Sequence, residues 1–117
     1  MQNYRNLDVW KISHELTMTI YRLTVEFPSD ERFNLTSQIR RSGVSIPSNI
    51  AEGCGRSSNA ELVRFLYIAM GSAQELDYQL FLSFELNYIY QENYESIKQH
   101  LTILQKKLNK FIQTLRY

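Results

Sequence analysis

The sequence contains few residues that cross-link chains or interrupt helices. Its 117 residues include one cysteine, two prolines and four glycines. A lone cysteine, Cys54, excludes a disulfide within the chain, and this is typical of a reducing compartment. No apolar run approaches the roughly 20 residues of a membrane-spanning helix, and the first residues lack the layout of a signal peptide. We therefore expect a cytoplasmic protein without a membrane partner.

Strand patterns are also missing, because no stretch alternates apolar and polar residues. Apolar residues make up 44% of the chain, enough to favour a folded core over disorder. The length fits one domain, residues 1–117. Apolar residues at helical spacing occur in four segments instead: about 6–26, 35–53, 58–86 and 92–115. Four such helices with short connections predict an all-α, antiparallel, up-down-up-down four-helix bundle.

The second predicted helix contains Pro47. A proline inside a helix removes one hydrogen bond and clashes with the carbonyl four residues earlier. That earlier residue is Gly43, which has no side chain and gives a kinked backbone room. We predict one helix bent at Pro47, with two separate helices as the alternative.

The third predicted helix has more apolar residues than one face of a bundle needs. Beside a core stripe that runs from Leu62 to Phe84, apolar residues occupy both flanks. A helix that is apolar nearly all round is a buried helix, so copies of the chain are expected to associate. The alternative is that these are single apolar residues on an ordinary surface. The flank residues that we expect at an interface between copies are Ile68, Leu82 and Leu86.

A polar stripe follows the second predicted helix at steps of four and three residues. It is either a solvated face or a polar seam that sets the register between subunits. Its members are Gln38, Ser42, Ser45, Asn49 and Glu52.

Charge is unevenly distributed along the chain although the net charge is +1. Residues 32–57 and 89–117 are basic, and the two other segments are acidic. Alternating signs allow neighbouring helices to attract one another, or they present basic surface to an anionic partner. The basic candidates for contact with RNA are Arg40, Arg41, Arg56, Lys98, Lys106, Lys107 and Lys110.

Residues for catalysis are scarce. His14 and His100 have no cysteine or carboxylate at a metal-ligand spacing, so no metal or other cofactor is expected. Cys54 is interpreted as a small buried residue, although a reactive thiol is the enzymatic alternative. No glycine-rich phosphate loop is present. We therefore expect no enzyme and no small-molecule substrate.

Several motifs carry a family resemblance. The segment 35–42 reads Leu-Thr-Ser-Gln-Ile-Arg-Arg-Ser, and the segment 45–53 reads Ser-Ile-Pro-Ser-Asn-Ile-Ala-Glu-Gly. Together with Phe27-Pro28, the opening 6–10 and the segment 71–76, they resemble the proteins encoded in intervening sequences of bacterial 23S rRNA genes. The resemblance covers essentially the whole chain.

This resemblance implies a four-helix bundle that assembles into a ring, typically a pentamer, and a ribosomal-protein-like description. A similar bundle is the accessory variability protein of diversity-generating retroelements, in which a basic ring engages nucleic acid. The resulting hypothesis is a non-enzymatic homo-oligomeric module that contacts RNA or a nucleoprotein. The alternative is a protein–protein scaffold without nucleic-acid contact.

Overall fold

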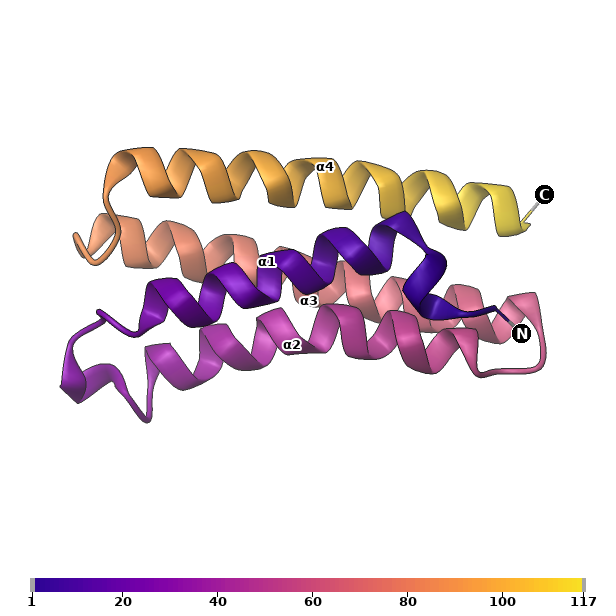
Figure 1. Ribbon diagram of the computed structural model, residues 1–117, viewed down its shortest axis with the longest axis horizontal. Helices are drawn as coiled ribbons and strands as arrows, with labels where there is room; N and C mark the ends of the chain where they lie inside the picture. Colours follow the sequence, from indigo (N-terminus) through magenta and orange to yellow (C-terminus); the bar gives the residue numbers. More distant parts are fainter. Residues whose placement is uncertain (1, 117) are drawn as a thin grey trace.

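The computed structural model describes residues 2–116 and contains four long helices, labelled in Figure 1. They are α1 (Asp8–Thr24), α2 (Leu35–Cys54), α3 (Asn59–Glu85) and α4 (Gln91–Arg116). Two short 3-10 helices, η1 (Tyr4–Asn6) and η2 (Ser29–Glu31), precede α1 and α2. Within residues 2–116 there is no strand, and no helix is long and apolar enough to cross a membrane.

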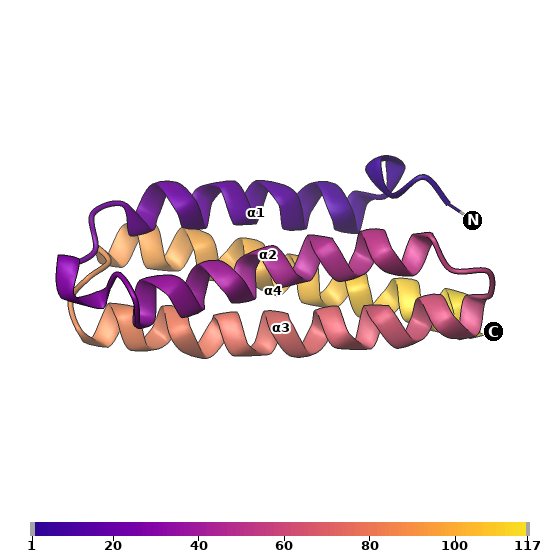
Figure 2. The same cartoon turned by 90° about the horizontal axis from the view of Figure 1, so that it is seen from below.

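The four helices lie side by side along the long axis of the molecule (Figures 1 and 2). The chain turns back at one end after α1 and after α3, and at the opposite end after α2. Each helix packs against two others, and among the described residues α1 does not contact α3 and α2 does not contact α4. The helices therefore occupy the corners of a square. The predicted all-α four-helix bundle is confirmed.

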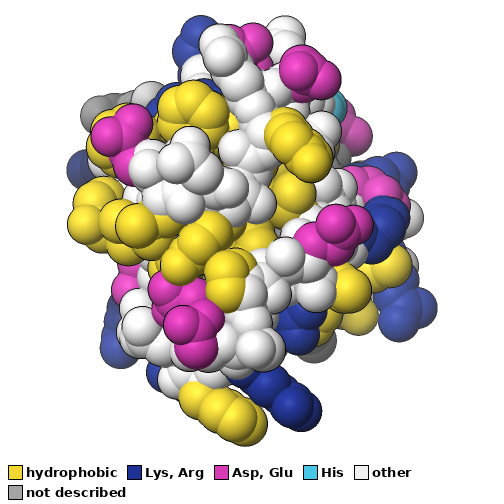
Figure 3. Space-filling model, turned by 90° about the vertical axis from the view of Figure 1, so that its left-hand side faces the viewer, with side chains coloured by type: hydrophobic (Ala, Val, Ile, Leu, Met, Phe, Trp, Pro, Cys, Tyr) yellow, Lys and Arg dark blue, Asp and Glu magenta, His cyan; other side chains and the backbone are white. Residues whose placement is uncertain are grey.

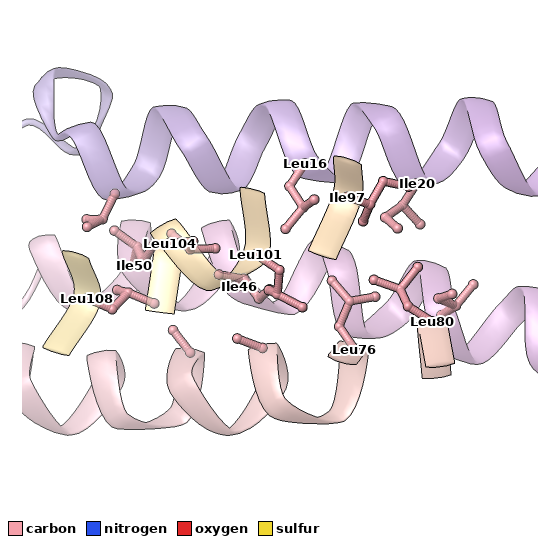
Figure 4. Close-up of a cluster of buried hydrophobic side chains, with 14 of the residues drawn as sticks. Leu16, Ile20, Ile46, Ile50, Leu76, Leu80, Ile97, Leu101, Leu104 and Leu108 are labelled. Atoms are coloured by element: carbon pink, nitrogen blue, oxygen red, sulfur yellow. The ribbon is translucent and has the colours of Figure 1, made fainter. Parts of the chain in front are cut away.

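The core runs along the bundle axis, where leucine and isoleucine side chains from all four helices point toward one another (Figure 4). Full burial of each such side chain stabilises the fold by about 1.5–3 kcal/mol. The residues with no exposed surface include Ile20 on α1, Ile39, Ile46 and Ile50 on α2, Leu66, Leu76 and Leu80 on α3, and Leu101, Leu104, Leu108 and Ile112 on α4.

Local signals in the sequence account for the ends of α3. The Ser58 hydroxyl accepts a hydrogen bond from the Glu61 backbone N–H at 3.2 Å, which satisfies a donor at the start of the helix. After the helix, Asn87 adopts a left-handed conformation with φ of 64°. Asparagine tolerates this conformation better than most residues, as expected at a helix C-terminus.

Helix α2 is continuous across Pro47, so the alternative of two separate helices is wrong. Because Pro47 has no N–H, the Gly43 carbonyl loses its usual partner, and the Thr17 hydroxyl of α1 donates to it at 2.9 Å. A side chain at Gly43 would not be excluded, because a methyl group there would lie 3.8 Å from Ile20, an ordinary contact. The bend at Pro47 stays a prediction.

Candidate functional site

The basic residues expected at an anionic partner do not form one surface. Arg40 and Arg41 lie on α2, whereas Lys106, Lys107 and Lys110 lie on α4. These helices occupy diagonal corners of the bundle and do not contact each other. A single chain therefore presents two separate basic groups.

Three of the seven predicted basic residues form ion pairs within the chain, two of them at close distance. Lys98 Nζ of α4 lies 2.5 Å from Asp77 Oδ1 of α3. Arg56 Nη2 lies 2.8 Å from Glu52 Oε2, and the Arg56 guanidinium lies 4.8 Å from the centre of the Phe65 ring. A carboxylate partner reduces the attraction of both cations for a phosphate.

The lysines of α4 are more accessible. Lys107 Nζ is 4.0 Å from Asp8 Oδ2, and both side chains are exposed, so this pair contributes little. Lys106 and Lys110 are exposed, and neither forms an ion pair with any of residues 2–116. Helix α4 therefore carries three cations that solvent reaches.

Arg40 is held in place against α1. Its Nε donates to the Thr24 hydroxyl at 2.8 Å, and its Nη2 donates to the Tyr21 carbonyl at 3.4 Å. Its guanidinium lies 4.9 Å from the centre of the Tyr21 ring. These contacts orient the guanidinium and leave other N–H groups of the side chain free to bind a ligand.

Arg40 and Arg41 line a cleft of about 460 Å³ on the surface between α1 and α2. We call it the arginine cleft. Arg40 and Arg41 were among the basic residues predicted from the sequence, whereas Arg32 and Phe33, which precede α2, were not. The signal in the sequence that could have found them was an arginine next to an aromatic residue in the segment between two predicted helices. The lining residues are Tyr21, Arg32, Phe33, Thr36, Ser37, Arg40, Arg41 and Val44.

The end of the bundle that carries η2 and the α3–α4 connection has hydrophobic side chains at its surface. Figure 3 shows them gathered there with both acidic and basic side chains around them. Phe33 is 88% exposed, and Tyr90, in the α3–α4 connection, is 79% exposed. Val25 and Leu86 are further exposed residues of the connections at this end. This end of the molecule is therefore not an ordinary polar surface.

The polar stripe predicted on α2 lies at the seam between α2 and α3. Ser42 donates to Glu75 Oε1 at 3.1 Å, and the hydroxyls of Ser45 and Ser72 are 2.7 Å apart. Further along α2, Asn49 Nδ2 donates to the Ser45 carbonyl at 2.8 Å. The middle of the stripe therefore has partners within the chain.

The residues at the two ends of the stripe have their partners in the segments next to α2. Gln38 Nε2 donates to Asn34 Oδ1 at 3.4 Å, and Glu52 accepts from Arg56. Both residues are exposed and remain candidates for an interface between copies.

The outer side of α3 exposes several large apolar side chains among polar ones. Of the three flank residues predicted at an interface, Ile68 and Leu86 are each 44% exposed, whereas Leu82 is half-buried against the core. Tyr67, Tyr78 and Phe81 extend the exposed surface, with exposures of 48%, 60% and 47%. We call these five exposed side chains, without Leu82, the outer face of α3; they come from both flanks of the helix, and Leu86 is the residue that follows it.

Comparison with known proteins identifies the family. The protein family described as "23S rRNA-intervening sequence protein" matches residues 5–110, which is most of the chain. The chain belongs to this family. The resemblance inferred from the sequence motifs is therefore confirmed.

A solved structure agrees with this assignment. The chain is similar to a crystal structure of a protein with unknown function from the S23 ribosomal protein family of Bacteroides thetaiotaomicron. The two share 35% sequence identity with a TM-score of 0.83, and the match covers 90% of this chain and 95% of the other. No curated protein matches the chain.

A groove lies between α1 and α4. Two clefts of about 480 Å³ each share Thr19, Ser96 and Ile97 and form one groove. Lys11, Glu15 and His100 line it, but none of them forms an ion pair or hydrogen bond that would activate a nucleophile. This arrangement offers a binding groove and no acid–base pair.

Other chemically active groups of this family member are also engaged or buried. Cys54 is 2% exposed, and burial raises the pKa of its thiol, which disfavours the reactive thiolate. His14 stacks on Trp10 with ring centres 4.9 Å apart, and His100 Nδ1 lies 2.8 Å from the Ser96 carbonyl. No three His, Cys, Asp or Glu side chains within residues 2–116 come together as metal ligands.

Proposed function

We propose that this protein is a non-enzymatic binding module that assembles into a ring of identical copies. The ring is a pentamer, as the resemblance to the family implies, and it contacts RNA or a nucleoprotein through basic surface. One observation carries the proposal: the outer face of α3 exposes five large apolar side chains on a single chain. The buried free thiol of Cys54 supports a cytoplasmic location.

The outer face of α3 is unusual for a surface that stays in water. Monomeric soluble proteins rarely expose many large apolar side chains on one helix unless the helix binds another surface, and five are exposed along α3 and at its end. Aromatic residues such as Tyr67, Tyr78 and Phe81 are also enriched at protein interfaces. Association through this face removes the apolar side chains from water, and this gain drives assembly.

The seam between α2 and α3 supports a defined arrangement of the copies. Ser45 and Ser72 are small and half-buried, so a neighbouring chain can approach the backbone closely. Polar groups that border an apolar interface fix its register, because a shifted partner leaves them without hydrogen bonds. Gln38 and Glu52 extend this polar border toward both ends of α2.

Sedimentation equilibrium of the full chain and of two matched variants tests the assembly. Ile68→Glu places a charge in the outer face of α3, whereas Ile103→Glu changes a residue of similar exposure, 40%, on α4. The wild type and Ile103→Glu are expected to sediment as multiples of 13.9 kDa, and Ile68→Glu as a smaller species. A wild type that stays a single chain at every concentration would refute the assembly.

Contact with RNA is supported by cations that have no carboxylate partner. Lys106, Lys110 and Arg41 form no ion pair with residues 2–116. Binding to structured RNA should weaken steeply as salt rises, because phosphate contacts release counterions. An affinity that does not change with salt concentration, or no binding at low salt, argues against RNA contact.

The alternative function is a protein–protein scaffold. The net charge of only +1 and the internal pairing of Arg56 and Lys98 favour it. Recovery of a defined protein partner after nuclease treatment, together with no RNA binding at low salt, would select the scaffold.

A further inference from the structure

We propose that the arginine cleft binds an unpaired segment of single-stranded RNA, with arginines on the phosphates and the Phe33 ring against a base. The cleft lies at the α1–α2 side of the bundle, away from the outer face of α3. This inference rests on the RNA contact of the proposed function and names its site and its ligand.

The charge of the cleft favours an anionic ligand. Arg32, Arg40 and Arg41 line it, and no carboxylate is among the lining residues. None of the three arginines forms an ion pair with a residue of the described chain, 2–116. A planar guanidinium matches the geometry of a phosphate and can bind it through two N–H groups.

The nearest acidic neighbour along the chain, Glu31, is already engaged. Its Oε1 accepts hydrogen bonds from Asn34 Nδ2 at 3.1 Å and from the Leu35 N–H at 3.4 Å. Its Oε2 accepts from the Tyr88 hydroxyl at 2.9 Å, and this bond raises the pKa of Tyr88. These contacts hold the Glu31 carboxylate and reduce its competition with a phosphate for Arg32.

The Phe33 ring gives the cleft a second recognition element. The side chain is 88% exposed, and the Arg32 guanidinium lies 5.2 Å from its ring centre. A nucleobase can stack on an exposed aromatic ring, and such stacking contributes about 1–3 kcal/mol per base. Stacking of a base on the ring thereby explains why an aromatic side chain is exposed beside the arginines.

These features favour unpaired RNA over other anions. A paired duplex keeps its bases stacked on one another, so they cannot reach Phe33. An acidic peptide could bind the arginines but would leave the aromatic ring without a role. The Ser37 hydroxyl lines the same cleft and can bond a ribose 2′-hydroxyl, which DNA lacks.

The test measures the affinity of the full-length protein for fluorescein-labelled oligouridine across a salt titration. Phe33→Ala should weaken binding about tenfold through lost stacking. Arg41→Ala should weaken it and lower the slope of log affinity against log salt by about 0.7. Arg41→Lys should keep the slope but recover the affinity only in part, because lysine cannot form the two-pronged contact.

Two control variants match these changes. Tyr90→Ala removes an aromatic residue that is 79% exposed at the same end of the bundle, outside the arginine cleft. Arg5→Ala removes an exposed cation of η1 that lies outside the arginine cleft and is not among the cations proposed to contact RNA. Both should leave oligouridine affinity within about twofold of the wild type, because a single cation distant from the bound strand contributes little. All the substituted side chains are exposed, so the fold is expected to persist.

The outcomes separate the cleft from the proposed function. If Lys106→Ala weakens oligouridine binding whereas Phe33→Ala and Arg41→Ala do not, the arginine cleft is not the binding site. RNA contact as such would still stand. A wild type that binds neither oligouridine nor structured RNA at low salt would overturn both. Equal competition by a fully paired RNA duplex or by polyglutamate would overturn the assignment to unpaired RNA. Equal affinity for oligodeoxyuridine would overturn the preference for ribose.

Discussion

At the scale of single residues, one hydroxyl compensates for a proline. Pro47 cannot donate a hydrogen bond to the Gly43 carbonyl, which is buried between α1 and α2. The Thr17 hydroxyl has one hydrogen and lies 2.9 Å from both the Gly43 and the Ser13 carbonyl oxygens, so the two acceptors share it. A buried carbonyl without a partner is costly, and Thr17 therefore makes Pro47 compatible with a continuous helix.

Substitution of Thr17 tests this account. Thr17→Val keeps the shape of the side chain but removes the hydroxyl, and it leaves the Gly43 carbonyl unsatisfied. The free energy of unfolding should fall by about 1–3 kcal/mol, measured by urea denaturation at a fixed protein concentration. Thr19→Val is the matched control, because the Thr19 hydroxyl bonds only to Glu15 of its own helix at a solvent-accessible site. Equal stability of the two variants would show that another group satisfies Gly43.

At the scale of helices, the approach of α2 to α3 depends on Gly53. A methyl group added to Gly53 would lie 2.9 Å from Leu62 Cδ1 and 2.9 Å from Phe65 Cβ. The Leu62 methyl group can rotate away, but Phe65 Cβ is fixed to the backbone of α3. The two helices must therefore separate near this point if the side chain grows.

A pair of alanine substitutions in α2 isolates this contact. Gly53→Ala should destabilise the fold by about 1–3 kcal/mol through overpacking. Gly43→Ala should be neutral or stabilise it by up to about 1 kcal/mol, because alanine favours the helix and its methyl group meets only Ile20 at 3.8 Å. Thermal unfolding of both variants provides the comparison. Similar losses at both positions would mean that the conformation of α2, and not its distance from α3, requires glycine.

The periodicity of apolar residues predicted the helices well but left some of their core positions undetermined. In α2, the apolar residues at helical spacing are Leu35, Ile39, Ile46 and Ile50, and all four are buried. In α4, steps of three and four residues lead from Leu108 to Phe111, yet Ile112 is fully buried and Phe111 only half-buried. Both are apolar neighbours at the edge of the stripe, and the neighbouring helices decide which of them points inward.

Buried polar residues were not predictable from the pattern at all. Ser13 and Thr24 of α1 have almost no exposed surface. They can be buried because their hydroxyls donate to carbonyls of their own helix. The arginine cleft was found only in part for a related reason. Arg32 and Phe33 are close to Arg40 and Arg41 in space because the chain turns into α2 there, and helical periodicity does not describe such a turn.

At the scale of the whole molecule, the two proposed surfaces lie on different sides of the square. The outer face of α3 belongs to one corner, and α1 occupies the diagonal corner. The arginine cleft is on the side formed by α1 and α2, so copies that associate through α3 leave it open. A ring would then present one cleft per copy, and several weak contacts with one RNA molecule would add up to tight binding.

Assembly through α3, as proposed, would also make the stability of the fold depend on protein concentration. If only folded chains associate, a tenfold rise in concentration should stabilise each chain by roughly 1 kcal/mol and raise Tm by about 4 °C. Calorimetry of the wild type over two decades of concentration should show this shift, and Ile103→Glu should retain it. Ile68→Glu, changed at a side chain that is 44% exposed on the single chain, should unfold at a Tm independent of concentration. A concentration-independent Tm for all three proteins would mean that the apolar side of α3 remains in water, and the drive for assembly would have to lie elsewhere.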